Sequence, residues 1–206
     1  MFVVTADQRG SRRGQDLVPQ LHEQVAQWQQ RYASRTEPFV RPLVRTAGDE
    51  VQGVLDDAHA VVSLALFLQR LGEWTVGIGA GSAELAETAP ASRGPAFIHA
   101  RDAVERARNA RRSAPLAVTG SNEDRAGEAE SLLQLLAVLV RRRTSAGWEA
   151  IDLLEELGTQ REVAQRLDIS AQAVSQRLAA ALWDEERSLH PLAARLLTEA
   201  GDGEGA

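Results

Sequence analysis

The first 120 residues alternate short apolar runs with longer segments whose apolar residues recur at helical spacing. A short apolar run between turn-forming residues is typical of a buried strand, whereas apolar residues three or four positions apart are typical of an amphipathic helix. Leu17, Leu21, Val25 and Trp28 follow the helical pattern. We therefore expect strands at 2–6, 39–46, 51–55, 74–80 and 116–118, and helices at 17–28, 58–71 and 96–112.

The order of these elements, β-α-β-β-α-β-α-β, predicts an α+β sandwich of the ferredoxin-like arrangement. We expect the helices to cover one face of a mostly antiparallel sheet. The second and third strands are joined by the turn Ala47-Gly48-Asp49-Glu50, which predicts a hairpin with two carboxylates at its tip.

From residue 121 onward the pattern is helical. We expect helices at 123–143 and 146–157, a third from Thr159, a fourth from Ser170 to about Trp183, and a last at 191–200. Charge changes at the same point, because residues 1–120 carry 14 Arg against 13 acidic residues and residues 121–206 carry 9 Arg against 16. With the polar turn at 119–122, this predicts an α+β domain at 1–120 and an all-α domain at 121–206.

The segment 159–183 has the spacing of a helix-turn-helix. The inner faces of its two helices would be formed by Val163, Ala164, Leu167, Val174 and Leu178, with the turn Asp168-Ile169-Ser170 between them. The second helix then leaves four polar side chains on or near its outer face: Gln172, Ser175, Gln176 and Arg177. Glutamine can read adenine bidentately, and Arg and Ser hold phosphates, so these residues are expected to bind DNA. The alternative is an ordinary two-helix corner. The segment resembles the helix-turn-helix of sigma-factor region 4 and of many one-component regulators.

The run LLQLLAVLV at 132–140 is apolar almost all round its helix. Such a helix is either buried within the chain or part of an oligomer contact. We expect it to contribute to a homodimer, since two-fold symmetry is the commonest solution. A dimer would bind a pseudo-palindrome with half-sites about one helical turn apart.

The amino-acid composition excludes several kinds of catalytic and metal-binding site. All 23 basic residues are arginine and cysteine is absent. This excludes a P-loop or Schiff-base lysine, a thiolate zinc site and a cysteine nucleophile. The net charge of −6 argues against a nonspecific polyanion binder. The N-terminal sequence MFVVTADQRG does not resemble a signal peptide, and the longest apolar run, 135–140, is far shorter than the roughly 20 residues that span a bilayer. We therefore expect a cytoplasmic protein.

Charge is the weak point of the DNA interpretation. The segment 159–183 carries three Arg against Glu162 and Asp168, whereas a DNA-binding domain usually offers a basic stripe. The triplet Arg141-Arg142-Arg143 could extend the basic surface. It could equally complement the dipole at the C-terminal end of a helix. The sequence leaves both interpretations open.

Two carboxylates are expected to converge in the N-terminal domain. Asp7 ends the first expected strand and Asp49 lies in the hairpin tip. If that strand lies beside the hairpin, the pair could hold Mg²⁺ or Mn²⁺, with nucleotide phosphates completing the shell. Gly10 and Ser11 would offer backbone amides to those phosphates. Taken singly, each residue is explained by turn chemistry.

These residues carry a resemblance to class III nucleotide cyclases. The segment Asp7-x-x-Gly-Ser is similar to their first metal motif, and Ala47-Gly48-Asp49-Glu50-Val51 is similar to the cyclase turn and to the GGDEF turn of diguanylate cyclases. The GIGAG segment at 77–81 and the helix starting at Gly94 follow in the same order. A short palm-like domain followed by a helix-turn-helix resembles the SatD family of bacterial proteins over nearly the whole chain. This resemblance implies a DNA-binding regulatory role.

The sequence also departs from the cyclase pattern. The positions of the catalytic asparagine and arginine fall on Ile98 and Asp102, unless Arg101 substitutes, and the base-selecting lysine is missing. Because loss of such a charge typically costs orders of magnitude in rate, the palm is expected to bind a nucleotide or metal without efficient cyclisation. The primary hypothesis is a DNA-binding regulator. The alternatives are a divalent-metal nucleotidyl cyclase or phosphotransferase using Asp7 and Asp49, and a pure interaction protein.

Overall fold

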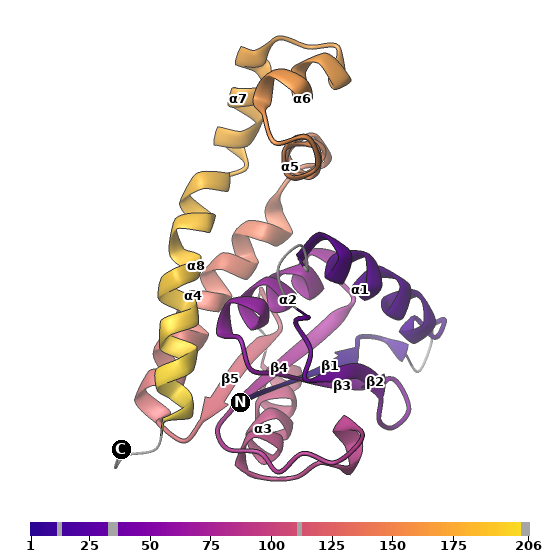
Figure 1. Ribbon diagram of the computed structural model, residues 1–206, viewed down its shortest axis with the longest axis vertical. Coiled ribbons are helices and arrows are strands. Elements are labelled where there is room, and N and C mark those ends of the chain that lie inside the picture. Colours follow the sequence, from indigo (N-terminus) through magenta and orange to yellow (C-terminus); the bar gives the residue numbers. More distant parts are fainter. Residues whose placement is uncertain (12–13, 33–36, 111–112, 203–206) are drawn as a thin grey trace.

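The computed structural model describes residues 1–11, 14–32, 37–110 and 113–202, which form an α+β protein with a five-stranded mixed sheet (Figure 1). The strands are β1 (Phe2–Gln8), β2 (Arg41–Arg45), β3 (Glu50–Leu55), β4 (Trp74–Ala80) and β5 (Leu116–Gly120). The helices are α1 (Val18–Tyr32), α2 (Ala58–Leu71), the short 3₁₀ helix η2 (Ala89–Ala91), α3 (Pro95–Asn109), α4 (Glu123–Arg142), α5 (Ser145–Leu157), α6 (Gln160–Leu167), α7 (Ala171–Ala180) and α8 (Trp183–Gly201). No helix in these ranges is long and apolar enough to cross a membrane.

The sheet confirms the predicted order of elements up to β5. Its strand order is β2-β3-β1-β4-β5, in which β1 is antiparallel to both neighbours and β4 is parallel to β5. The central strand β1 is buried along nearly its whole length, as a strand covered on both faces must be. Its register sets Asp7 opposite Glu50 on β3 and Thr75 on β4. Polar residues therefore meet at the end of the sheet where β1 finishes.

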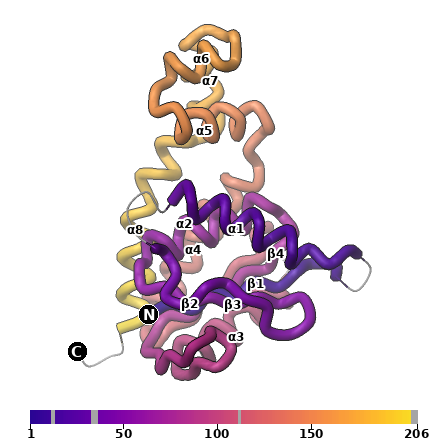
Figure 2. The backbone as a smooth tube through the Cα atoms, turned by 45° about the vertical axis from the view of Figure 1, so that its right-hand side comes forward, coloured from indigo at the N-terminus to yellow at the C-terminus, as the bar shows by residue number. Residues whose placement is uncertain are grey.

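Helices cover both faces of the sheet, so the expectation of one covered face was wrong. The core that contains Val4 and Ile78 also includes residues of α1 and α2, whereas α3 packs on the opposite face against β4 and β5 (Figure 2). Glycines in β4 make this approach possible. A Cβ atom at Gly79 would lie 2.1 Å from the carbonyl oxygen of Ala96 in α3, and one at Gly77 would be almost as crowded. The GIGAG segment thus has a packing role.

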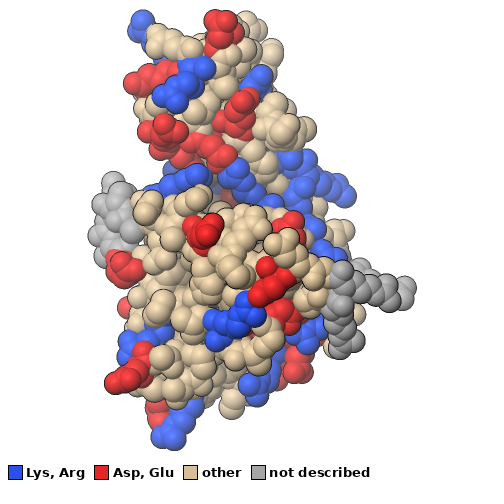
Figure 3. Space-filling view, turned by 90° about the vertical axis from the view of Figure 1, so that its right-hand side faces the viewer, with Lys and Arg blue, Asp and Glu red and all other residues tan. Residues whose placement is uncertain are grey.

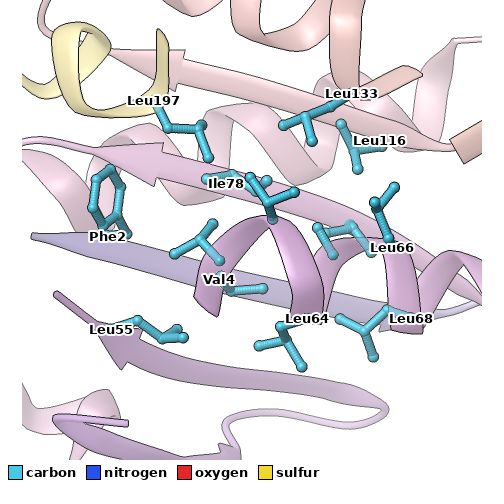
Figure 4. Close-up of a cluster of buried hydrophobic side chains, with 14 of the residues drawn as sticks. Phe2, Val4, Leu55, Leu64, Leu66, Leu68, Ile78, Leu116, Leu133 and Leu197 are labelled. Atoms are coloured by element: carbon cyan, nitrogen blue, oxygen red, sulfur yellow. The ribbon is translucent and has the colours of Figure 1, made fainter. Parts of the chain in front are cut away.

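The long helices α4 and α8 lie side by side and pack on α2 and β5 (Figure 1). Their buried leucines Leu133 and Leu197 belong to the same apolar core as Ile78 and Leu116 of the sheet (Figure 4). The last turn of α8 lies so close to Gly120 that a Cβ there would be 2.3 Å from a backbone oxygen. The main core therefore continues across the turn at 119–122. We call the sheet with α1–α4 and α8 the body.

The helices α5, α6 and α7 form a separate cluster, here called the head, beyond one end of the α4–α8 pair (Figures 1 and 2). The head encloses its own apolar core, whose buried members are Ala150, Ile151, Val163, Ala164, Val174, Leu178, Ala181 and Trp183. The predicted inward orientation of Val163, Ala164, Val174 and Leu178 is confirmed, and Leu167 packs on them partly buried.

The boundary between the last two helices differs from the prediction. Helix α7 ends at Ala180, and α8 runs unbroken from Trp183 to Gly201 with Pro191 inside it, where a new helix was expected to start. Proline costs one backbone hydrogen bond and a local clash. Packing outweighs this cost, because Trp183 is buried in the core of the head and Leu197 in the core of the body.

Candidate functional site

The chain reverses between α6 and α7 in a short turn fixed by backbone geometry. Asp168 adopts a left-handed conformation with φ of 53°, which ends α6. The side chain of Ile169 folds back onto the core of the head, and its backbone NH donates to the carbonyl oxygen of Ala164 at 3.0 Å. The Ser170 hydroxyl oxygen then accepts a hydrogen bond from the NH of Ala173 at 3.1 Å and starts α7.

Thr159 caps α6 through half of a capping box. Its hydroxyl oxygen accepts the backbone NH of Glu162 at 3.3 Å. The Glu162 carboxylate accepts the Thr159 hydroxyl at 2.6 Å instead of the backbone NH that a capping box uses. The cap still fixes where α6 begins.

The outer face of α7 presents Gln172, Ser175 and Gln176, all of them exposed. They lie within about one helical turn of each other, because residues three and four apart share a helix face. Arg177 differs from them. Its side chain is about one-third exposed, and its Nη1 donates to a carboxylate oxygen of Glu149 on α5 at 2.9 Å. Three of the four predicted DNA-contacting residues are therefore free on the surface, and the fourth is held against the head.

Acidic and basic side chains are interspersed over the head, while arginines gather where the head meets the body (Figure 3). Residues 145–182 carry six acidic residues and three arginines. Two of these arginines, Arg161 and Arg166, are exposed on α6. The head thus offers few basic groups to a nucleic acid.

The arginine triplet at the end of α4 is used mainly for structure. The guanidinium group of Arg143 is 2 % exposed and forms an ion pair with Glu186 of α8 at 3.1 Å. Arg141 directs its guanidinium at the carbonyl oxygens of Gln69 and Gly72, each at 3.4 Å, where α2 ends. Arg142 is exposed. The structure therefore leaves one of the three free to extend a basic surface.

Asp7, at the end of β1, is held by a cation that the sequence did not reveal. Arg108 of α3 donates to both carboxylate oxygens of Asp7, at 3.0 Å and 2.8 Å. Burial raises the pKa of Asp7, Arg108 opposes this rise, and the neighbouring carboxylates of Asp49 and Glu50 add to it. Asp49 is therefore close enough to Asp7 to act on it. We call these four side chains the carboxylate corner.

The three carboxylates of the carboxylate corner are not arranged as ligands of one metal ion. Within the described ranges, no group of three or more His, Asp or Glu residues is arranged to hold a metal ion. Asp7 already gives both oxygens to Arg108. A site for Mg²⁺ or Mn²⁺ at Asp7 and Asp49 stays a prediction, and it requires Arg108 to move away.

The loop after β1 carries the expected nucleotide-binding residues. Gly10 has φ of 77°, a left-handed conformation that favours glycine, and a Cβ atom there would have no neighbour within 4 Å. The buried amide of Gln8 organises this loop, since it donates to the carbonyl oxygen of Gln15 at 2.7 Å and accepts the NH of Leu17 at 2.9 Å. The phosphate-binding role of Gly10 and Ser11 stays a prediction.

The positions that correspond to cyclase catalytic residues lie on the solvent side of α3. Ile98 is 63 % exposed, and Arg101 and Asp102 are also exposed. Arg108 lies seven residues after Arg101, two helical turns further along, and it is the arginine that faces Asp7. Helical spacing from Arg101 could have indicated that Arg108 lies on a neighbouring part of the same helix. The sequence alone gave no reason to choose Arg108 over the other arginines as the partner of Asp7.

The head is joined to the body through Trp148 of α5. Its ring lies 3.8 Å from the guanidinium carbon of Arg70 on α2 and 4.8 Å from that of Arg143. Arg70 also donates two hydrogen bonds of 2.6 Å to the carboxylate of Asp152. An open cleft of about 740 Å³ borders this contact. Because Arg70 and Asp152 neutralise each other on its wall, the cleft offers no free charge at that point to bind a ligand.

Comparison of the chain with protein-family models, with curated proteins and with solved structures found no match.

Proposed function

We propose that this protein is a DNA-binding regulator of the SatD type, in which α6 and α7 form a helix-turn-helix and α7 reads DNA. The observation that carries the proposal is the outer face of α7. Gln172, Ser175 and Gln176 are exposed together there, on a helix whose other side is buried in the core of the head. A face of glutamines and serine has the hydrogen-bonding groups that recognise base edges and phosphates.

The small number of basic groups on the head limits how the protein can bind DNA. With few free arginines on the head, the protein makes few phosphate contacts, and binding should weaken only modestly as salt rises. Arg177 can contact DNA only by leaving Glu149, an exposed ion pair of the kind worth about 0–1 kcal/mol. Direct base contacts from the glutamines then carry most of the specificity.

The test is selection of genomic fragments by the purified protein, followed by substitution. Gln176→Ala should cost about 1–3 kcal/mol in affinity and relax specificity at one position. Gln27→Ala, an exposed glutamine on α1, is the matched control and should leave affinity unchanged. Failure to select any sequence at low salt, where binding is strongest, would reject the proposal.

The body supports a second candidate function, the binding of a nucleotide with a divalent cation by a palm-like, ferredoxin-like domain. The strand order β2-β3-β1-β4 and the carboxylate corner at the end of β1 support this reading. Asp7 and Asp49 would hold the cation, and the cation would neutralise both the carboxylates and the phosphates. Gly10 and Ser11 would contact the phosphates.

This second function is tested by thermal unfolding with Mn²⁺ and a nucleoside triphosphate. A ligand that binds the folded state raises the melting temperature. Asp49→Asn should abolish that rise. Arg108→Ala should enlarge the response to Mn²⁺ alone, because it frees both oxygens of Asp7. If Mn²⁺ and the nucleotide leave the melting temperature of the wild type and of both variants unchanged, the carboxylate corner has a structural role and this second function is rejected.

A further inference from the structure

We propose that two copies of this chain associate through the outer face of α4, in antiparallel orientation about Leu135. The buried side of α4 contains Ala129, Leu133, Leu136, Ala137 and Val140. The opposite side, here called the α4 face, is formed by Asp124, Gly127, Glu128, Ser131, Leu135, Val138, Leu139 and Arg142. Leu135 is 55 % exposed at its centre, and Val138 and Leu139 beside it are partly exposed. Leu132, Val138 and Leu139 are partly buried and pack on the intrachain core, so Leu135 is the apolar residue of the run at 132–140 that the core leaves mostly exposed.

Charge along the α4 face selects the orientation of the partner. The face is acidic at its first two turns, with Asp124 and Glu128, and basic at its end, with Arg142. A two-fold axis at Leu135 sets Glu128 of one copy opposite Arg142 of the other, twice. A parallel pairing would instead oppose like charges. A second copy of the chain therefore fits this face in one orientation.

The side chains involved are free to pair. Glu128 meets Arg125 at 2.7 Å in an exposed ion pair one turn away, an interaction worth a few tenths of a kcal/mol that exchanges easily. Arg142 has no ion pair within the part of the chain that the structure describes. Each copy therefore has Glu128 and Arg142 on either side of Leu135, and both can pair with a second copy at little cost in existing interactions.

Side-chain size fits the same axis. Ser131 of one copy lies opposite Leu139 of the other, and Gly127 beside Ser131 leaves further room for that leucine. Close approach of two helices, about 8–10 Å between axes, needs such small residues opposite large ones. The ion pairs Arg125–Glu199 and Arg143–Glu186 fix the two ends of α4 against α8.

This pairing sets the two heads at opposite ends of the dimer. Helix α4 has 20 residues and is about 30 Å long, and each head lies beyond its C-terminal end. The inference does not rest on DNA binding. If the head reads DNA as proposed, the half-sites lie farther apart than the single helical turn expected from the sequence.

The absence of cysteine makes a crosslinking test direct. In Leu135→Cys the two introduced thiols meet at the axis, and mild oxidation should convert nearly all of the protein to a disulfide-linked dimer. Ile98→Cys, which replaces an exposed apolar residue on α3, is the matched control and should form no disulfide-linked dimer under the same conditions. Equal crosslinking of the two variants, or none in either, would overturn the proposal.

Charge reversal tests the orientation, with light scattering of the wild type and variants at micromolar concentration and no DNA present. Glu128→Arg and Arg142→Glu should each raise the dimer dissociation constant about tenfold, and the double variant should restore it. A monomeric wild type contradicts dimerisation. A double variant weaker than either single contradicts the antiparallel register. Neither outcome bears on whether the head binds DNA.

Discussion

A single arginine decides the electrostatic state of the end of β1. Asp7 is mostly buried, so its charge is costly, and Arg108 is the group that compensates for it. Because the pKa of Asp7 is raised from its ordinary value of 3.8, the ionised carboxylate is less stable in the folded than in the unfolded protein. Stability from this group is therefore fully present below pH 3.8 and is lost as the pH rises through the folded pKa.

Removing Arg108 should reveal the free-energy cost of burying the charge of Asp7. At pH 7, Arg108→Ala should lower the free energy of unfolding by about 1–3 kcal/mol, because Asp7 keeps a charge that has lost its partner. The loss should shrink as the pH is lowered and Asp7 becomes protonated. Urea unfolding at several pH values measures both effects. Arg101→Ala, an exposed arginine on the same helix, should stay within about 0.5 kcal/mol of the wild type at every pH. A pH-independent loss in Arg108→Ala would show that packing, and not the charge of Asp7, is responsible.

At the scale of elements, the contact between α3 and β4 depends on the lack of side chains in the strand. Gly77 and Gly79 face the helix so closely that its backbone fills the space of a Cβ atom. The helix carries Arg108 toward Asp7, so this contact also positions the carboxylate corner.

Adding one methyl group to β4 should push α3 away. Gly79→Ala should cost about 3 kcal/mol, because backbone atoms cannot move aside as a flexible side chain can. Gln27→Ala is the control: it lies exposed on α1, and the variant should stay within about 0.5 kcal/mol of the wild type. Thermal unfolding compares the two. A harmless Gly79→Ala would mean that α3 sits farther from the sheet.

Across the whole molecule, a buried arginine ties the head to the body. Besides its bond to Glu186, Arg143 donates to the carbonyl oxygens of Ala181 and Leu182, where α7 passes into α8. Burial acts to raise the pKa of Glu186, but bonds from His190 and Arg143 outweigh it and leave that pKa below its ordinary value. The stability that this carboxylate contributes is therefore present above pH 4.5 and is lost as the pH falls through the folded pKa.

Breaking this pair should destabilise head and body together. Arg143→Met should cost about 3–5 kcal/mol at pH 7, because the buried Glu186 carboxylate loses its arginine partner. The double variant Arg143→Met/Glu186→Gln should recover most of that loss, since no charge is then buried unpaired. Chemical unfolding followed by circular dichroism gives both values. If the double variant is as unstable as the single, the arginine acts through its carbonyl contacts and tryptophan neighbours instead.

Much of this architecture could be predicted from local pattern. Apolar runs and helical periodicity located the five strands and most helices, because each is a short stretch whose burial depends on its own spacing. The same holds for Ser170, whose capping role needs only the three residues that follow it. The prediction from periodicity was wrong at Pro191, a residue that locally favours the start of a helix. Helix α8 continues through Pro191 because both of its ends are packed in apolar cores.

Contacts between residues far apart in the sequence belonged to the tertiary structure alone. Asp7 and Arg108 are 101 positions apart, and their meeting depends on the depth at which glycines let α3 settle on β4. Glu149 was unremarkable in the sequence, yet it holds Arg177 because α5 packs on α7. Local spacing determines which side of a helix is apolar. Which charged groups of different elements come to lie opposite each other depends on how those elements pack. No local pattern encodes the distance between residues that are far apart in the sequence.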